Sequence, residues 1–145
     1  MRRALSVLLS GSLLCLAGCF KSESDDAITF QIRTTESTNR GNPVHVVIKE
    51  TSAIDFWIDG YPEISKLLWT EKEEDPSCHF KDSVIPGKTA KIRIEKVAKD
   101  KSLGIYFLFT NPKESWKYLI PDPQSQNVKI SLGEDECEAI NIFKS

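Results

Sequence analysis

The stretch Leu103-Gly-Ile-Tyr-Phe-Leu-Phe-Thr110 is apolar at both alternate sets of positions. Successive side chains of a β-strand point to opposite faces of its sheet, so a strand with this pattern is covered on both faces. We therefore expect residues 103–110 to form a central strand that has other parts of the chain packed on each side of it.

The chain around this strand, from Ala27 onward, alternates with a period of two. Ala90, Ile92 and Ile94, for example, alternate with charged neighbours, which is typical of a half-exposed strand. Turn signals such as Pro86-Gly87 separate the alternating segments. In all we expect about eight strands, near residues 28–33, 44–51, 78–85, 88–97, 103–110, 116–120, 127–132 and 137–143.

One segment has a helical period instead. Pro62 and Glu63 are favourable in the first turn of a helix, and the charged residues 71–75 would end it. Between them four apolar residues recur at helical spacing: Tyr61, Ile64, Leu67 and Leu68. A lone helix among short strands, without a repeated strand–helix–strand unit, predicts an all-β fold, a two-sheet β-sandwich with one short helical insertion.

The N-terminus has the pattern of an export signal. Two arginines precede an apolar run of about fourteen residues, which is shorter than the roughly 20 needed to span a bilayer. The run ends in Leu16-Ala-Gly-Cys19, which resembles a bacterial lipoprotein processing site. We expect residues 1–18 to be a cleaved signal peptide, 19–26 a tether lipidated at Cys19, and 27–145 the sandwich. The alternative is a plain signal peptide with Cys19 as an ordinary thiol.

Composition and motifs argue against several functions. The chain has 19 basic and 21 acidic residues without a basic run, so nothing marks a nucleic-acid surface. We find no glycine-rich phosphate loop, nucleophile elbow or zinc-protease helix. Cys78 and His79 are adjacent on a strand and would point to opposite faces, so they cannot share one metal ion. We expect no catalytic residue, no metal and no cofactor, and we therefore expect that the protein is not an enzyme.

Cys78 and Cys137 are a candidate disulfide in an oxidising periplasm. The bridge would close a loop of about 60 residues and stabilise the fold by roughly 4 kcal/mol. Strict alternation sets Cys78 on the face of Phe80, but sets Cys137 opposite to Ile140, so only one of the two is clearly inward. Both a disulfide and two free thiols remain open.

The three tryptophans admit a ligand-binding interpretation. An exposed cluster of Trp57, Trp69 and Trp116 could stack on sugar rings. Packing is the favoured interpretation, because Trp116 begins a strand and the other two flank the predicted helix.

The whole order of segments resembles a known family. The chain has a lipobox at Cys19, a loop with Asn39 and Gly41 before Pro43-Val44, a helical insertion at 56–68, a Pro86-Gly87 turn, the apolar strand 103–109 and Trp116-Lys117. This order and spacing resemble the outer-membrane lipoproteins of type VI secretion systems, the TssJ (SciN-like) family. The short loop before Pro43 and the acidic run 71–75 depart from the family pattern.

The resemblance implies a transthyretin-like sandwich with a structural role. It implies a lipid-anchored outer-membrane protein that faces the periplasm, because Phe20 rather than Asp follows Cys19. It further implies a partner, the periplasmic part of an inner-membrane TssM-like protein. The family's binding loop joins the first two strands, so the candidate partner-binding residues are Glu36, Asn39, Arg40 and Asn42; the alternative is that this loop is only a polar connection. Other functions left open are a pilotin of a type III secretion system and a periplasmic ligand-binding sandwich.

Overall fold

The structure is a computed structural model that describes residues 26–71, 75–124 and 126–144. The signal peptide predicted for residues 1–18 and the lipidation site Cys19 lie outside the described residues, as does the predicted tether apart from Asp26.

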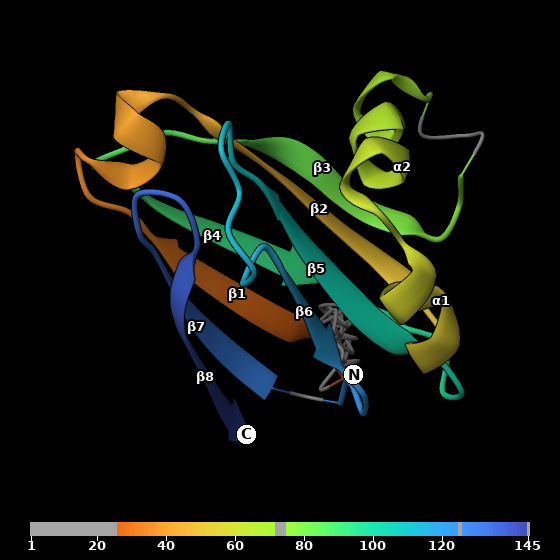
Figure 1. Cartoon of the computed structure of the whole chain (residues 1–145). Coiled ribbons are helices and arrows are strands. Elements are labelled where there is room, and N and C mark those ends of the chain that lie inside the picture. Colours follow the sequence, from red (N-terminus) through yellow and green to blue (C-terminus); the bar gives the residue numbers. More distant parts are fainter. Residues whose placement is uncertain (1–25, 72–74, 125, 145) are drawn as a thin grey trace, which may run out of the picture.

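Eight strands in the described part of the chain form two four-stranded sheets (Figure 1). The first sheet has the order β4-β1-β7-β8 and the second has the order β3-β2-β5-β6. Neighbouring strands are antiparallel except for β1 and β7, which are parallel. The strands are β1 (Ile28–Arg33), β2 (Val44–Thr51), β3 (Cys78–Val84), β4 (Thr89–Ile94), β5 (Ser102–Leu108), β6 (Lys117–Ile120), β7 (Gln126–Leu132) and β8 (Cys137–Lys144). The predicted all-β sandwich is confirmed.

The core lies between the facing sheets and follows the alternation of the sequence. In β1, Ile28, Phe30 and Ile32 are fully buried and pack against the inward residues of the second sheet. Each such side chain contributes about 1.5–3 kcal/mol by leaving water. The alternating segments therefore fold because each buries one face.

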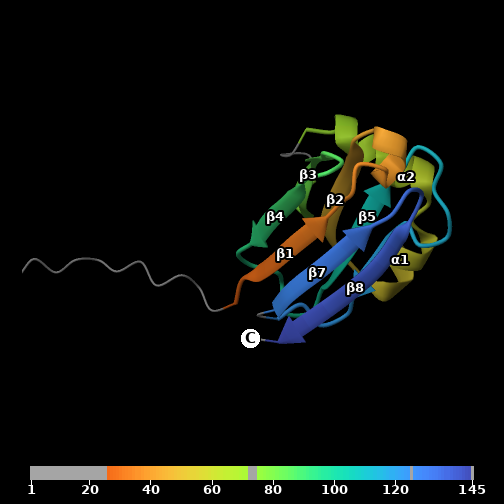
Figure 2. The same cartoon turned by 90° about the vertical axis from the view of Figure 1, so that its left-hand side faces the viewer.

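Strand β5 is covered on both faces, as its sequence predicts. Ile105 and Phe107 lie in the sandwich core, whereas Tyr106 and Leu108 lie in a second cluster on the outer face of the second sheet. Phe56 and Ile64 of the helical insertion belong to the same cluster. Figure 2 shows the helices as a third layer over this sheet.

The insertion contains more helix than the sequence indicates. It consists of α1 (Ala53–Ile58), α2 (Tyr61–Lys66) and the short 3-10 helix η2 (Leu67–Trp69); another 3-10 turn, η1 (Thr38–Gly41), lies between β1 and β2. α2 has Pro62 in its first turn, as predicted. The helical spacing noted at residues 61–68 did not include α1, although α1 overlaps the helical insertion expected at 56–68 from the resemblance. The apolar residues Ile54, Trp57 and Ile58 of α1 also recur at helical spacing, but only Phe56 of this helix is buried. None of the helices in the described residues is long and apolar enough to cross a membrane.

Candidate functional site

Four connections between strands meet at one end of the sandwich, at the upper left of Figure 1. They are residues 34–43, 85–88, 109–116 and 133–136, and we call this surface the loop end. Backbone hydrogen bonds join them: the Gly87 amide donates to the Thr35 carbonyl (3.0 Å) and the Lys113 amide donates to the Asp135 carbonyl (3.0 Å). The β1–β2 loop is thus one part of a bonded assembly.

Asn39 holds the centre of the loop end. Its side chain is 2% exposed, its Nδ2 donates to the Pro43 carbonyl (2.8 Å) and its Oδ1 accepts from the Thr110 amide (2.9 Å). Its φ of 49° lies in the left-handed region, which Asn tolerates better than most residues. Next to it, the buried Thr38 hydroxyl donates to the Leu132 carbonyl (2.9 Å).

Burial corrects one of the sequence predictions. Asn39 was a candidate partner-binding residue, but its side chain is enclosed and fully occupied in shaping the loop. Glu36, Arg40 and Asn42, the other three candidates, are all exposed on the loop end. The structure therefore brings three of the four candidates to one surface and assigns the fourth to the interior.

Arg40 is the main charged group of this surface. Its Nε lies 3.3 Å from Glu134 Oε1 and its Nη2 lies 3.2 Å from Asp135 Oδ2. The hydrogen bond to Asp135 and its charge raise the pKa of Arg40 above the ordinary value. The guanidinium is nevertheless about half exposed, so it is positioned and accessible at the same time.

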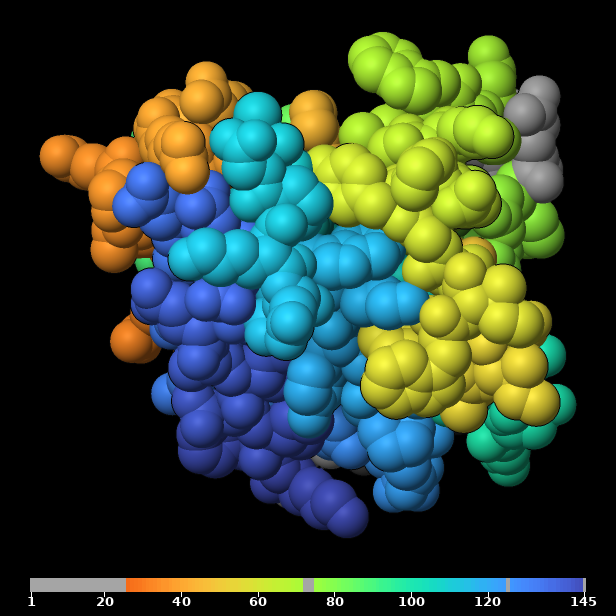
Figure 3. Space-filling view, in the orientation of Figure 1, coloured from red at the N-terminus to blue at the C-terminus, as the bar shows by residue number. Residues whose placement is uncertain are grey.

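A second distinctive surface lies on α1, shown in yellow at the lower right of Figure 3. Ile54, Trp57 and Ile58 are each more than 70% exposed, and we call these three residues the α1 apolar face. The helix begins at Ser52, whose hydroxyl accepts from the Asp55 amide (3.0 Å). The sequence alone could have shown this capping residue, but not which face of the helix is exposed.

The C-terminal end of α1 is bound to the second sheet. Lys117 Nζ donates to the carbonyls of Phe56 (2.6 Å) and Asp59 (2.8 Å). Burial lowers the pKa of Lys117. These bonds satisfy carbonyls that a helix end leaves without partners. α1 is therefore held firmly while its apolar face remains in solvent.

Two of the three tryptophans do not pack as expected. Trp116 packs against the second cluster, which lies between the helices and the outer face of the second sheet and which we call the helix-side cluster. The ring centroid of Trp116 is 5.3 Å from that of Tyr61. Trp57 is 75% exposed and Trp69 is 88% exposed. The prediction that the tryptophans pack is thus correct for Trp116 and wrong for the two on the helical insertion.

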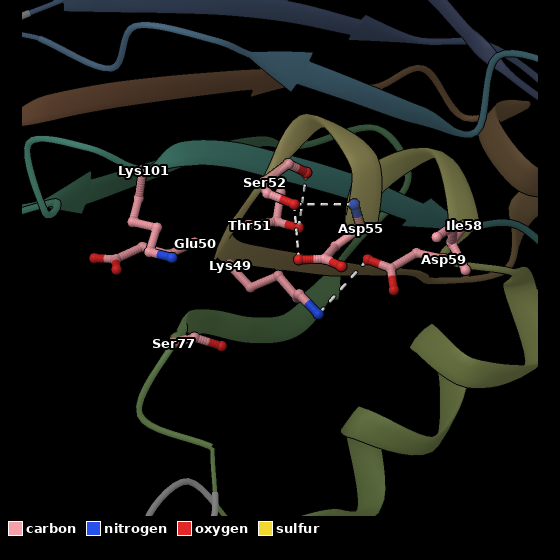
Figure 4. A pocket seen from close by; sticks show the side chains of 9 residues that line it. All are labelled: Lys49, Glu50, Thr51, Ser52, Asp55, Ile58, Asp59, Ser77 and Lys101. Carbon is pink, nitrogen blue, oxygen red and sulfur yellow. Dashed lines mark hydrogen bonds and ion pairs between the residues drawn. The ribbon is translucent and has the colours of Figure 1, made fainter.

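A polar cavity of about 360 Å³ lies beside α1 (Figure 4). Asp59 Oδ2 accepts from the Tyr106 hydroxyl (2.7 Å) and lies 3.6 Å from Lys49 Nζ. Burial, reinforced by the Asp59 carboxylate, raises the pKa of Tyr106 well above its ordinary value. Within the residues that the structure describes, no group of three His, Cys, Asp or Glu side chains is placed to hold a metal ion. The cavity lining comprises Lys49, Glu50, Thr51, Ser52, Asp55, Ile58, Asp59, Ser77 and Lys101.

The two cysteines are free thiols, so the candidate disulfide is not formed. They lie on edge strands at opposite sides of the sandwich, Cys78 on β3 and Cys137 on β8. Cys78 packs in the helix-side cluster, and Cys137 packs against the sandwich core. Burial raises the pKa of Cys137 to about 11 and also raises that of Cys78.

Two register shifts explain why strict alternation misplaced both cysteines. The β2–β3 pairing shifts between Ile48 and Lys49, which puts Cys78 and Phe80 on opposite faces. The β7–β8 pairing shifts between Ser131 and Leu132, so Cys137 and Ile140 both pack on the core. An extra residue in one strand reverses the parity beyond it.

Solved structures share this fold, although no curated protein sequence matches the chain. The T6SS lipoprotein TssJ1 from Pseudomonas aeruginosa is 13% identical, with a TM-score of 0.64 over 83% of this chain and 98% of that chain. Serratia marcescens Lip, described as a membrane-bound component of the type VI secretion system, is 13% identical, with a TM-score of 0.60 over 83% and 99%. A structure described as the T6SS protein TssM C-terminal domain from EAEC contains a chain that is 14% identical, with a TM-score of 0.53 over 80% and 99%.

These likenesses confirm the predicted resemblance to the TssJ-type lipoproteins, which at such identities is a likeness of fold. A family model gives the assignment at the level of sequence. The model described as IglE, N-terminal domain, matches residues 45–132, which is more than half of the chain and runs from β2 to β7. The chain therefore belongs to the IglE N-terminal domain family.

Proposed function

We propose that this protein is a lipid-anchored structural component of a type VI secretion envelope complex. In this role it lies at the outer membrane, faces the periplasm and binds the periplasmic part of a TssM-like inner-membrane protein. The proposal is supported by the shared fold of two proteins described as a T6SS lipoprotein and a membrane-bound component of that system. The match in a structure described as a TssM C-terminal domain supports the choice of partner.

The observation that carries the proposal is the position of the loop end. The described chain begins at Asp26, and β1 runs from Ile28 to Arg33 directly into the β1–β2 loop. Six strand residues at about 3.3 Å each separate the two ends by about 20 Å. A protein anchored through its N-terminal side would therefore present the loop end away from the membrane, toward a periplasmic partner.

The loop end also has the properties of a preformed binding surface. Asn39 and Thr38 fix the loop through buried hydrogen bonds, so binding costs little additional ordering. Arg40 projects from this rigid base, and arginine is enriched among the residues that dominate interface energies. Glu36 and Asn42 would add polar contacts around it.

Cys19 is the proposed anchor. Two or more acyl chains on this residue would hold the protein stably at a membrane, whereas one chain binds only marginally. The eight Cα–Cα steps from Cys19 to Ala27 reach at most about 28 Å when extended. We expect Cys19→Ser to leave the sandwich folded and to abolish membrane association; a Cys19→Ser variant that still fractionates with outer membranes would contradict the anchor.

The partner contact is tested by binding to the purified periplasmic domain of the TssM-like protein encoded by the same organism. We expect Arg40→Glu to weaken binding at least about tenfold, because it reverses the central charge of the surface. Lys101→Glu is the matched control: it makes the same charge reversal at an exposed residue that lines the cavity beside α1. Absence of binding by the unmodified protein refutes the function, and equal losses in both variants refute the loop end as the site.

A second candidate is a periplasmic ligand-binding sandwich, which is favoured by the exposure of Trp57 and Trp69. Tryptophan fluorescence titrated with soluble peptidoglycan fragments tests it, because stacking of a sugar on either ring changes the emission. No change up to about 10 mM fragment would exclude sugar binding at these rings at the affinities typical of weak ligands. Gene neighbourhood separates the pilotin alternative, since a pilotin predicts an adjacent secretin and the leading proposal predicts sheath and baseplate genes.

A further inference from the structure

The two sheets expose four edge strands, and three of these are protected against pairing with another chain. An unprotected edge presents backbone donors and acceptors to any strand that approaches it. β4 has Lys91 and Arg93, and β3 has Lys81 and Asp82. β6 has only four residues and is followed by Pro121. Charge, short length and proline are the usual means of blocking such an edge.

β8 has much less protection. It is the outermost strand of the first sheet in Figure 2. Its only charged residues are Glu138 and Lys144, and the sequence between them is Ala139-Ile-Asn-Ile-Phe143. Phe143 is 49% exposed and Ile142 is 38% exposed. The edge is therefore long, mostly apolar and open.

The free part of this edge is defined by one hydrogen bond. The Cys137 amide donates to the Ser115 carbonyl (2.9 Å), so the start of β8 is covered by the β5–β6 connection. The remaining residues run from Glu138 to Lys144. Asn141 is the middle residue of that segment.

We propose that β8 pairs with β8 of a second copy of this chain, antiparallel and about a two-fold axis at Asn141. This pairing joins two four-stranded sheets into one continuous sheet. Glu138 then faces Lys144 of the second copy, and Ala139 faces its Phe143. Ile140 faces Ile142 of the second copy, and the two Asn141 side chains face each other.

The strand is self-complementary in this register. Opposite charges and apolar residues that face each other across an antiparallel pair are stabilising. The faces also agree: Ile140 and Ile142 pair with the inward residues Ile130 and Val128 of β7, so both lie on the core side. Ala139 and Phe143 both lie on the outer side, where a small residue leaves room for a large one.

Neighbouring registers lose this match. Moving the axis by one residue toward the N-terminus sets Glu138 against Ile142 of the second copy. Moving it the other way sets Lys144 against Ile140. The charges at the two ends of the free edge therefore select the register centred on Asn141. Glu138 is itself the extra residue of the β8 bulge, because Cys137 pairs with Leu132 and Ala139 pairs with Ser131. The proposed contact with Lys144 of the second copy therefore relies on the length of the two side chains and not on a regular position of Glu138 in the ladder.

The pairing involves seven residues of each copy, so the interface is small and the association is expected to be weak and reversible. Sedimentation velocity on the purified full chain measures it across protein concentrations. We expect Glu138→Lys and Lys144→Glu to weaken dimerisation about tenfold each, because either change makes both charge pairs of the dimer repulsive. The double variant Glu138→Lys/Lys144→Glu restores opposite charges and should dimerise like the parent. Lys91→Glu on the β4 edge is the matched control and should have no effect.

A cross-link tests the register directly. Residues opposite each other in an antiparallel pair have Cα atoms about 4.5–5.5 Å apart, which is within the range of a disulfide. Asn141→Cys should therefore give a covalent dimer on mild oxidation, whereas Lys91→Cys and the parent chain should not.

A parent chain that remains monomeric up to about 1 mM, or a double variant no better than the single ones, overturns the proposal. A dimer that forms normally in all three charge variants would overturn β8 as its interface. None of these measurements requires a TssM-like partner, so their outcome is independent of the proposed function.

Discussion

Removing the side chain of Asn39 tests the interpretation of the loop end most directly. Asn39→Ala eliminates the hydrogen bonds to Pro43 (2.8 Å) and Thr110 (2.9 Å), which contribute about 1 kcal/mol each. Alanine also lacks the tolerance of asparagine for a φ of 49°, which adds about 1 kcal/mol. We expect the free energy of unfolding to fall by about 3 kcal/mol.

Asn39→Gly separates the two contributions. Glycine adopts positive φ without strain, so this variant should lose only the hydrogen-bond part, about 2 kcal/mol. The difference of about 1 kcal/mol between the two variants measures the backbone contribution.

Urea unfolding of the full chain, followed by far-ultraviolet circular dichroism, is the assay. With an m-value of about 1.5 kcal/mol/M, the midpoint of Asn39→Ala should fall by about 2 M urea. Asn42→Ala is the matched control, because Asn42 is exposed and its side chain makes one long bond to the Asn39 carbonyl (3.3 Å). A loss below about 1 kcal/mol for Asn39→Ala, or an equal loss for Asn42→Ala, would refute the reasoning.

The remaining predictions concern other parts of the fold. Because burial raises the pKa of Cys137 to about 11, iodoacetamide should alkylate it at pH 8 about 200-fold more slowly than a free cysteine, with the rate rising about tenfold per pH unit toward pH 11; a rate like that of free cysteine would contradict this. The protonated Cys137 thiol therefore stabilises the fold fully below the unfolded pKa near 8.5–9, and this contribution is lost as the pH rises toward 11. Over that pH range the urea midpoint of Cys137→Ser should decline less than the urea midpoint of the parent. Trp57→Ala should change the free energy of unfolding by less than about 0.5 kcal/mol, whereas Trp116→Ala should lower it by about 3 kcal/mol. Similar changes in the free energy of unfolding for the two variants would show that the packing of these tryptophans is misassigned. Ser52→Ala should lower it by about 1 kcal/mol through loss of the α1 cap, as measured by thermal unfolding, whereas no loss would mean that the cap is not formed.

The strands were predictable because each one is an alternating segment that buries one face. The predicted bounds of 28–33 and 44–51 match β1 and β2, and the doubly apolar segment 103–110 forms the central strand β5. α2 was predictable from Pro62 and the spacing of Ile64 and its neighbours. These signals depend on local periodicity and need no knowledge of the partner strands.

The errors occurred where a contact distant in sequence decides the outcome. Asn39 looked like a surface residue of a polar loop, but the Thr110 amide, 71 positions later, donates a hydrogen bond to its Oδ1 in the interior. Trp57 looked like a packing residue, but the sheet beneath α1 is already filled by Phe56 and Tyr106. The two cysteines were misplaced by bulges, which have no signature in the alternating pattern.

The sequence by itself determined the class of fold and the strand segments, because burial of alternate residues is a local property of each segment. It also determined the likeness to a secretion lipoprotein, because the order and spacing of segments can be read directly along the chain. Only the tertiary structure decided which loop residues remain accessible, that Cys78 and Cys137 lie at opposite edges, and that β8 is left with an open edge. Strand order, register and bulges set these features, and all three arise from pairing between segments that the chain brings together only when it folds.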